Sequence, residues 1–491
     1  MNILSLLTFA PAILGLVLLF LPEKQAKTAK ALAFAGALGL FGWGLLKLWP
    51  MHAAPSLAPE RFLWFTVAGL PVEYHLGLDG LNYWLVLLTL FLVPLTMAAT
   101  WNSIKEGEGR FNALFLILQT GMVGALLAQD LLFFYLFWEA MLIPMYFMIG
   151  VWGGDDRRYA ANKFFLFTLS GSLLWLVALL YIAGKAGSFN PTLMASAASQ
   201  LPFGAQAWLF LAFAVAFAIK VPLFPLHTWL PDAHVEAPTG GSVVLAAIML
   251  KLGAYGFLRF SLPIAPDAAH EYAWFIIALS LIAVVYIGLV AMVQQDMKKL
   301  VAYSSIAHMG FVTLGFFIFN ELGMSGGIVQ MISHGFVSGA MFLSIGVLYD
   351  RVHSREISAY GGVVNTMPKF AAFALLFSMA NCGLPGTAGF IGEWMVILGS
   401  VGYNFWIGLL AATAVIFGAA YSLWMYKRVY FGDVTNDHVR ELTDINAREF
   451  GMLAVLAIAV LAMGLYPKPF TDVMHASVTE LLKHVAVSKI N

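Results

Sequence analysis

The chain has 491 residues, of which 61% are hydrophobic and 11% charged, and its mean hydropathy is +0.84. Soluble domains carry roughly 25% charged residues, so this composition excludes a soluble fold and indicates a protein dissolved in lipid. The 26 basic residues balance the 26 acidic ones, which argues against a nucleic-acid partner. The single cysteine, Cys382, excludes disulfides within the chain and iron–sulfur or zinc sites built on several cysteines.

Apolar stretches long enough to cross a bilayer recur along the chain. The first, near 2–21, is too long for a signal peptide and has no basic residue ahead of it, so we interpret it as a membrane span. We predict an all-α, polytopic membrane protein of about fourteen spans, because unpaired backbone groups in lipid cost several kcal/mol each. The spans lie near 2–21, 31–49, 81–100, 111–129, 131–152, 163–184, 206–226, 242–260, 272–294, 300–320, 325–349, 370–400, 404–426 and 450–466.

The loops between these spans are too short to form a separate soluble domain, so the function is expected within the membrane. The seventh and twelfth spans are interrupted by helix breakers. Their spacing suits two inverted repeats of five helices each, made of spans four to eight and nine to thirteen. We therefore expect N-terminal helices at 1–110, a first repeat at 111–260, a second repeat at 261–428, and a last helix with a C-terminal tail at 429–491.

Basic residues gather in alternate loops, a bias that sets the orientation of membrane proteins. The richer side includes Arg157, Arg158 and Lys298, whereas the poorer side includes Lys185 and Lys489. We expect the richer side to face the cytoplasm and both termini to lie outside.

Ionisable residues fall inside the predicted spans at Glu139, Lys220, Lys251, His308, His334 and Glu393. A charged group at a helix centre costs about 2.5–3.5 kcal/mol on insertion scales, so such residues usually mark a pathway. A structural alternative is that Glu139 and Lys220 form an ion pair that holds helices together, while Lys251 extends to an interface. That alternative explains one pair better than a series of charges, although a single buried histidine is often structural.

Helix breakers flank two of these residues. Pro222 and Pro225 closely follow Lys220, and the segment GLPGTAG at 383–389 precedes Glu393. Irregular backbone at membrane depth is tolerated where it lines a cavity, and paired interruptions are typical of transporter sites. Prolines that only kink helices for packing are the alternative, which explains one such site more readily than two.

The buried charges suggest a mechanism of proton transfer. Burial favours the neutral form of an ionisable group, and a nearby opposite charge restores the charged form. If Glu139 approaches Lys220, the lysine keeps its proton. If they separate, Lys220 releases the proton toward Lys251 and then along the remaining candidates.

Several long motifs carry a family resemblance, which extends from about residue 77 to 430. They are FWEAMLIPMY, IKVPLFPLHTWLPDAHVEAPT, LKLGAYGFLRF, DMKKLVAYSSIAHMG, the ISHG around His334, and LPGTAGFIGEW. Together they resemble the subunit M family of bacterial proton-pumping NADH-quinone oxidoreductases, which includes the mitochondrial chain 4 of complex I.

The resemblance implies an antiporter-like subunit of an H⁺-translocating NADH:quinone oxidoreductase, in the bacterial inner (plasma) membrane. Such a subunit has no cofactor of its own and is driven by quinone reduction elsewhere in the complex. Its partners would be lipid and the other membrane subunits, especially neighbouring antiporter-like ones.

The resemblance also implies roles for the buried residues. Glu139 and Lys220 would form the paired switch, Lys251 and His308 the central relay, and Glu393 the terminal group on the exit side. His334 would be a supporting relay group.

Two other functions remain open. A subunit of a multi-subunit sodium/proton antiporter or of a membrane-bound hydrogenase would share most motifs, but those relatives usually place lysine at the position of Glu393. A bis-histidine haem protein would use His308 and His334, but it would leave the buried lysines and acids without a purpose.

Overall fold

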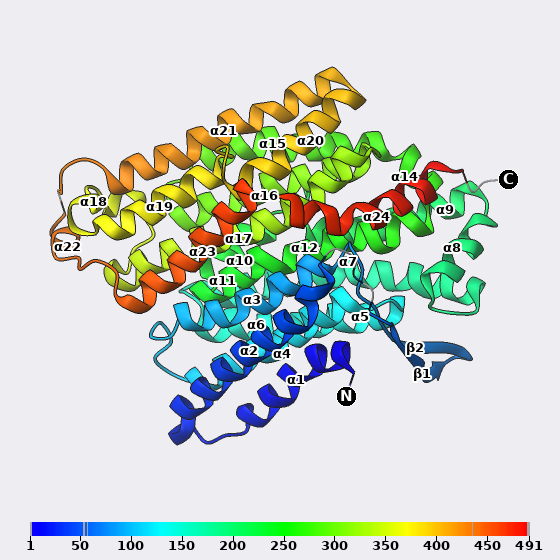
Figure 1. Cartoon of the computed structure of the whole chain (residues 1–491), viewed down its shortest axis with the longest axis horizontal. Coiled ribbons are helices and arrows are strands. Elements are labelled where there is room, and N and C mark those ends of the chain that lie inside the picture. The colour runs from blue at the N-terminus through cyan, green and yellow to red at the C-terminus, as the bar shows by residue number, and fades with distance from the viewer. Residues whose placement is uncertain (1, 53–54, 56, 435, 489–491) are drawn as a thin grey trace.

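The computed structural model describes residues 2–52, 55, 57–434 and 436–488. In this part of the chain, helices run roughly side by side, with the strands and the C-terminus at one end and α18 and α22 at the other (Figure 1). Among the described residues, eleven helices are long and apolar enough to cross a membrane, and shorter apolar helices lie at Ile3–Leu19, Tyr83–Ala99 and Ala388–Tyr403. Every predicted span coincides with one of these helices, so the polytopic helical fold is confirmed.

The first third of the chain holds the N-terminal helices and the strands. Its elements are α1 (Ile3–Leu19), η1 (Glu23–Gln25), α2 (Ala26–Leu48), η2 (Trp49–Met51), β1 (Glu60–Val67), β2 (Leu70–Leu76), α3 (Tyr83–Ala99), α4 (Glu108–Leu127), α5 (Leu131–Ala140) and α6 (Leu142–Trp152).

The middle of the chain includes one long helix, Thr239–Ile264, that contains two π-helical turns, η3 and η4. The elements here are α7 (Arg157–Ala186), α8 (Pro191–Ser199), α9 (Phe203–Lys220), α10 (Trp229–Glu236), α11 (Thr239–Val244), η3 (Leu245–Met249), α12 (Leu250–Gly256), η4 (Phe257–Ser261), α13 (Leu262–Ile264), α14 (Pro266–Glu271) and α15 (Ala273–Met292).

The last part includes the longest helix, α17, which is buried along most of its length. The elements are α16 (Met297–Phe317), α17 (Glu321–Val352), η5 (Ile357–Ala359), α18 (Val363–Thr366), α19 (Pro368–Asn381), α20 (Ala388–Tyr403), α21 (Phe405–Tyr430), α22 (Asp437–Arg440), α23 (Ala447–Leu465) and α24 (Lys468–Ala486).

Both predicted discontinuous helices are confirmed. The first is interrupted between α9, which ends at Lys220, and α10, which begins at Trp229. The Trp229 indole donates to the Ile219 carbonyl over 2.8 Å, so it satisfies a carbonyl at the broken helix end. The second is interrupted between α19 and α20, where Gly383 adopts a φ of +74°, a conformation that glycine reaches without steric cost.

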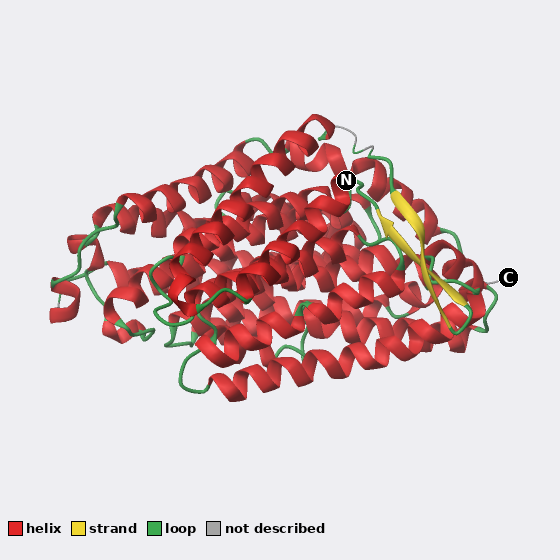
Figure 2. Ribbon diagram, turned by 90° about the horizontal axis from the view of Figure 1, so that it is seen from below, coloured by secondary structure: helices red, strands yellow, loops and turns green. Residues whose placement is uncertain are grey.

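One expected loop is ordered. The strands β1 and β2 form an antiparallel hairpin that pairs Glu60 with Leu76 and Val67 with Leu70, at the same end as the C-terminus (Figure 2). The Glu60 carboxylate accepts hydrogen bonds from the Leu4 and Ser5 backbone amides at 2.8 and 3.0 Å. The hairpin therefore caps the start of α1, whose first amides have no partner within the helix.

The C-terminal tail is also more ordered than predicted, because it forms the amphipathic helix α24. Its buried positions are Val473, Met474, Val478, Leu481 and Val485, a spacing that places them on one face. Lys489, predicted to lie outside the cell, is not among the described residues.

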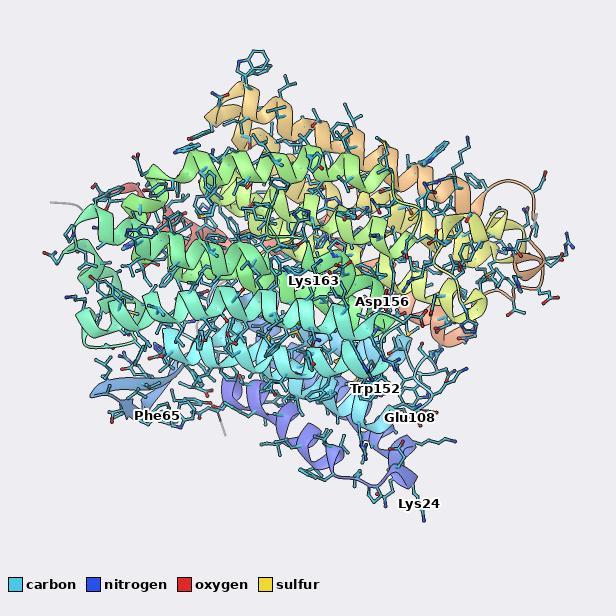
Figure 3. The ribbon with its side chains drawn as sticks, turned by 180° about the vertical axis from the view of Figure 1, so that it is seen from behind. Lys24, Phe65, Glu108, Trp152, Asp156 and Lys163 are labelled. Carbon is cyan, nitrogen blue, oxygen red and sulfur yellow. The ribbon has the colours of Figure 1, made fainter. Side chains whose placement is uncertain are left out.

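Charged residues expected on the cytoplasmic side gather at one end of the bundle. Lys24, Glu108 and Asp156 lie toward the end away from Phe65 of the hairpin (Figure 3). The boundaries and inverted relation of the two repeats stay predictions.

Candidate functional site

Four of the predicted residues form a row of close neighbours that crosses three contacts between helices. The Lys251 Nζ atom lies 2.6 Å from Nδ1 of His334, and His308 Nδ1 lies 2.6 Å from Oε1 of Glu393. The two histidine rings, between these contacts, have centroids 5.6 Å apart. All four residues are buried. The row therefore runs from α12 through α17 and α16 to α20.

The backbone around Lys251 directs its side chain toward α17. The π-helical turn η3 ends two residues before Lys251, and the Lys251 ammonium donates to the Ala246 carbonyl in that turn over 2.5 Å. Such turns are rare and occur frequently at functional sites. Lys251 is 1% exposed, so its side chain does not extend to an interface.

Glu393 occupies a polar niche next to the interruption of its helix. Gln330 Nε2 lies 3.2 Å from Glu393 Oε1, and Ser333 donates to the Gln330 side-chain oxygen over 3.1 Å. A Cβ atom at Gly383 would stand 3.0 Å from Glu393 Oε2. The glycine thus gives the carboxylate room as well as ending the helix.

A small cavity lies between the histidines and Glu393. Its volume is about 10 Å³, and its lining includes His308, His334, Ser333 and Glu393. The Nε2 atoms of both histidines have no hydrogen-bond partner in the described part of the protein. A polar space of this size corresponds to about one water position, so the two rings are suited to exchange a proton through one water.

Glu139 and Lys220 are close but do not form an ion pair within the described chain. Lys220 Nζ has no hydrogen-bond partner there and stands 4.9 Å from the centre of the Trp138 ring. Glu139 Oε1 is also without a partner, and the polar side chains beside this carboxylate are Ser172 and Tyr135. The predicted pair is therefore open, with Trp138 providing a cation–π contact to the lysine.

The end of α9 packs directly on α12, which brings the two lysine-bearing helices together. A Cβ atom at Gly253 would meet the Phe217 carbonyl at 2.7 Å and Lys220 Cβ at 2.9 Å. A side chain at this position would push the helices apart. The glycine therefore keeps the Lys220 and Lys251 backbones close.

The histidine pair does not suit a haem. His308 Nδ1 and His334 Nδ1 already contact Glu393 and Lys251, and the space between the rings measures about 10 Å³. A macrocycle requires far more room. The described residues also contain no cluster of three or more His, Cys, Asp or Glu that could hold a metal ion.

Residues 128–418 match the family described as NADH:quinone oxidoreductase/Mrp antiporter, TM, and residues 61–129 match NADH-ubiquinone oxidoreductase chain 4, amino terminus. NADH-quinone oxidoreductase subunit M of Rhodobacter capsulatus is 46% identical over 98% of this chain and 97% of the relative. The chain belongs to the subunit M family.

Solved structures agree with this assignment. A chain of respiratory complex I from Thermus thermophilus superimposes with a TM-score of 0.88 and 33% identity, covering 98% of this chain and 99% of the other. A chain of the Mrp complex from a Dietzia species reaches a TM-score of 0.84 at 19% identity, covering 99% of both. The latter likeness concerns the fold alone. The 46% identity to a subunit M over nearly the whole chain favours subunit M over the antiporter alternative.

The structure adds buried polar residues that the sequence analysis did not select. Lys298 was assigned to a loop, but it lies in the first turn of α16 and is 5% exposed, and its Nζ donates to the Ala237 carbonyl over 2.6 Å. His234, on α10, is fully buried against the Phe342 ring. The signal for His234 was its position shortly after the first interruption, between Pro231 and Pro238. Gln330 and Ser333 carried no such signal.

Proposed function

We propose that protons cross this subunit M family member along the row that begins at the Glu139–Lys220 switch and ends at Glu393. The family assignment makes the chain an antiporter-like, proton-translocating membrane subunit of a NADH-quinone oxidoreductase. The observation that supports the path is the set of contacts from Lys251 through both histidines to Glu393. Quinone reduction, in other subunits, supplies the driving energy, and this chain carries no cofactor.

The central row suits stepwise transfer because each imidazole has two nitrogens. A proton that passes from Lys251 Nζ to His334 Nδ1 allows His334 to release another from Nε2 toward His308. His308 then releases one from Nδ1 to the Glu393 carboxylate, its contact at 2.6 Å. A histidine relays protons in this way because its ordinary pKa lies near working pH.

The open arrangement of Glu139 and Lys220 suits the switch. Moving the carboxylate toward Lys220 stabilises the charged lysine, and moving it away disfavours that charge in a buried site. A buried lysine without a hydrogen-bond partner is therefore prepared to transfer its proton toward Lys251. This coupling would link events at one end of the subunit to proton movement in its centre.

The row is tested by replacing its first member, Lys251→Met, in the reconstituted complex. We expect proton pumping to fall at least about tenfold, because a buried thioether cannot titrate. Pumping is measured by a pH dye in proteoliposomes, and gels report assembly. Lys185→Met is the matched control, since Lys185 is exposed at the end of α7. Wild-type pumping by assembled Lys251→Met complex would contradict the path.

We also propose that the chain lies in the bacterial plasma membrane beside other antiporter-like subunits, with both termini on the periplasmic side. The accumulation of basic residues in alternate loops supports this orientation. A cysteine at Arg157 should resist an impermeant thiol reagent added to intact cells, whereas a cysteine at Lys489 should react. Labelling at position 157 from outside would show that the orientation is the opposite of the proposed one.

A further inference from the structure

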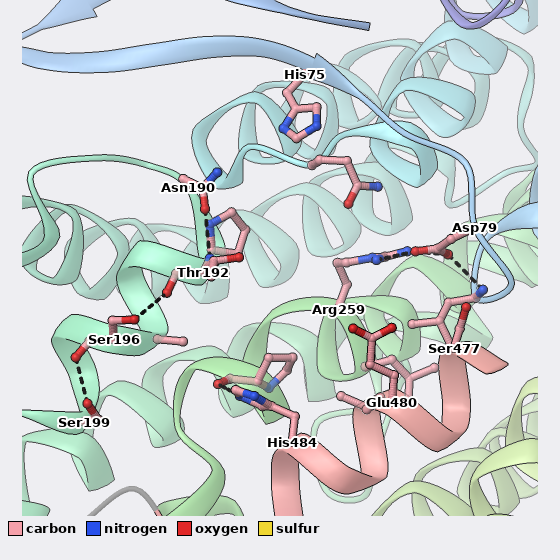
Figure 4. A pocket seen from close by; sticks show the side chains of 17 residues that line it. His75, Asp79, Asn190, Thr192, Ser196, Ser199, Arg259, Ser477, Glu480 and His484 are labelled. Carbon is pink, nitrogen blue, oxygen red and sulfur yellow. Dashed lines mark hydrogen bonds and ion pairs between the residues drawn. The ribbon is translucent and has the colours of Figure 1, made fainter. Parts of the chain in front are cut away.

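A large cavity lies outside the row of buried residues. It has a volume of about 700 Å³ and is lined by the end of β2, the segment before α3, α8, the end of the Thr239–Ile264 helix, and α24. Most of its side chains are polar or titratable, among them His75, Asn190, Glu480 and His484 (Figure 4). We call this cavity the vestibule. A polar space of this size holds many water molecules.

Arg259 and Asp79 meet at one wall of the vestibule. Arg259 Nη1 lies 2.6 Å from Asp79 Oδ2, and Nη2 lies 2.7 Å from Oδ1, so the contact is bidentate (Figure 4). The Arg259 side chain is 14% exposed. The guanidinium is therefore held rigidly where the polar space meets the packed helices.

Arg259 is on the same helix as Lys251, eight positions further along, a separation of roughly 12 Å in rise. Tyr255 lies midway, and its hydroxyl accepts from Arg259 Nε and donates to the Leu126 carbonyl, both over 2.9 Å. Asn82 is fully buried and donates to that same carbonyl over 2.8 Å. These bonds fix the positions of side chains that lie along the helix between Arg259 and Lys251.

Groups around Asp79 also hold the Arg259–Asp79 pair in place. The Asp79 carboxylate also accepts from the Leu81 amide over 2.9 Å, while Asn82 Oδ1 accepts from the Asp79 amide over 2.9 Å. Burial would raise the pKa of Asp79, but the charge and hydrogen bonds of Arg259 outweigh it and hold that pKa below its usual range. The pair thus stays ionised at working pH.

We propose that Arg259, held by Asp79, is an electrostatic barrier that keeps protons in the vestibule from reaching Lys251. The proposal rests on the proposed path through Lys251. A fixed guanidinium repels a proton or hydronium that approaches through polar space, as a cation in a pore does. Asp79 and Tyr255 position the guanidinium. Its role is to prevent proton entry from the vestibule rather than to carry protons.

The test measures passive proton entry in the whole complex, reconstituted in proteoliposomes without NADH. A potassium diffusion potential drives protons inward, and an internal pH dye records the rate. Arg259→Gln should raise that rate on the order of tenfold, because it removes the repelling charge while keeping a polar side chain. Arg259→Lys should stay near the wild-type rate. Arg61→Gln is the matched control, since Arg61 pairs with Glu73 on the hairpin.

Two further variants separate charge from packing and identify the route. Asp79→Asn leaves the positive charge of Arg259 in place, so its passive proton entry should stay at the wild-type rate. Proton entry in Asp79→Asn as fast as in Arg259→Gln would overturn the barrier. Arg259→Gln combined with Lys251→Met should return to the wild-type rate, because the leak passes through Lys251. Wild-type proton entry in an assembled Arg259→Gln complex would also overturn the proposal. Failure of the proposed path would show instead as normal pumping by Lys251→Met alone.

Discussion

The two ends of the proposed path differ in how their charges are satisfied. Between Lys251 and Glu393, each titratable side chain has a neighbour at 2.6 Å. At the other end, Lys220 Nζ and Glu139 Oε1 have no hydrogen-bond partner in the described chain. Lys220 is 1% exposed and Glu139 is half-buried. An unsatisfied buried charge such as that of Lys220 is costly, whereas a bonded row is stable. The open pair is therefore suited to moving, and the bonded row is suited to conducting.

The comparison predicts the largest loss at the open pair. Lys220→Ala or Glu139→Gln should nearly abolish pumping and coupled quinone reduction, a loss of about tenfold or more, because either change removes one member of the switch. Pumping is followed in proteoliposomes and assembly by gel.

The exposed Glu106 supplies the matched control, Glu106→Gln. If the assembled switch variants pump at wild-type rates, the difference between the two ends has no functional meaning.

A smaller, graded effect is expected at Glu393. Glu393→Gln should lower pumping several-fold, since an amide cannot bind and release a proton. Glu393→Asp should retain part of the activity, because it still titrates but reaches less far toward His308. Initial rates of dye response in reconstituted, assembled complex provide the measurement.

Gln could replace a helix-capping glutamate in part, so full pumping by Glu393→Gln would assign Glu393 a structural role. Glu441→Gln, at an exposed position, controls for the loss of one acidic group.

The smallest effect should follow loss of a neighbour of the row. Gln330→Ala removes the amide 3.2 Å from Glu393, and one hydrogen bond contributes about 1 kcal/mol. We expect a two- to fivefold lower pumping rate, roughly the equivalent of that energy, measured in the same vesicle assay beside the exposed control Gln200→Ala. A loss as large as that of Lys220→Ala would place Gln330 within the path itself.

The spans were predictable from sequence because their length and apolar composition are set by the bilayer. The hairpin was not, because its turn, Ala68–Gly69, lacks the Asn-Gly or Asp-Gly signal. Lys298 was assigned to a loop because it is a charged residue next to a polar segment of low hydropathy. In the structure it lies in the first turn of α16. The residues of the row were identifiable as buried charges, but their contacts depend on side-chain rotamers and helix packing. The open geometry of Glu139 and Lys220 also depends on rotamers and packing, so it could not be inferred from the sequence.

The capping of α1 by Glu60 has a consequence for biogenesis. The Leu4 and Ser5 amides gain their acceptor from a residue more than fifty positions later in the chain. The chain therefore makes both of its first two helices before it makes this acceptor. The start of α1 gains its cap only when the hairpin segment lies beside it. The hairpin thus ties the beginning of the chain to a segment that follows the second helix.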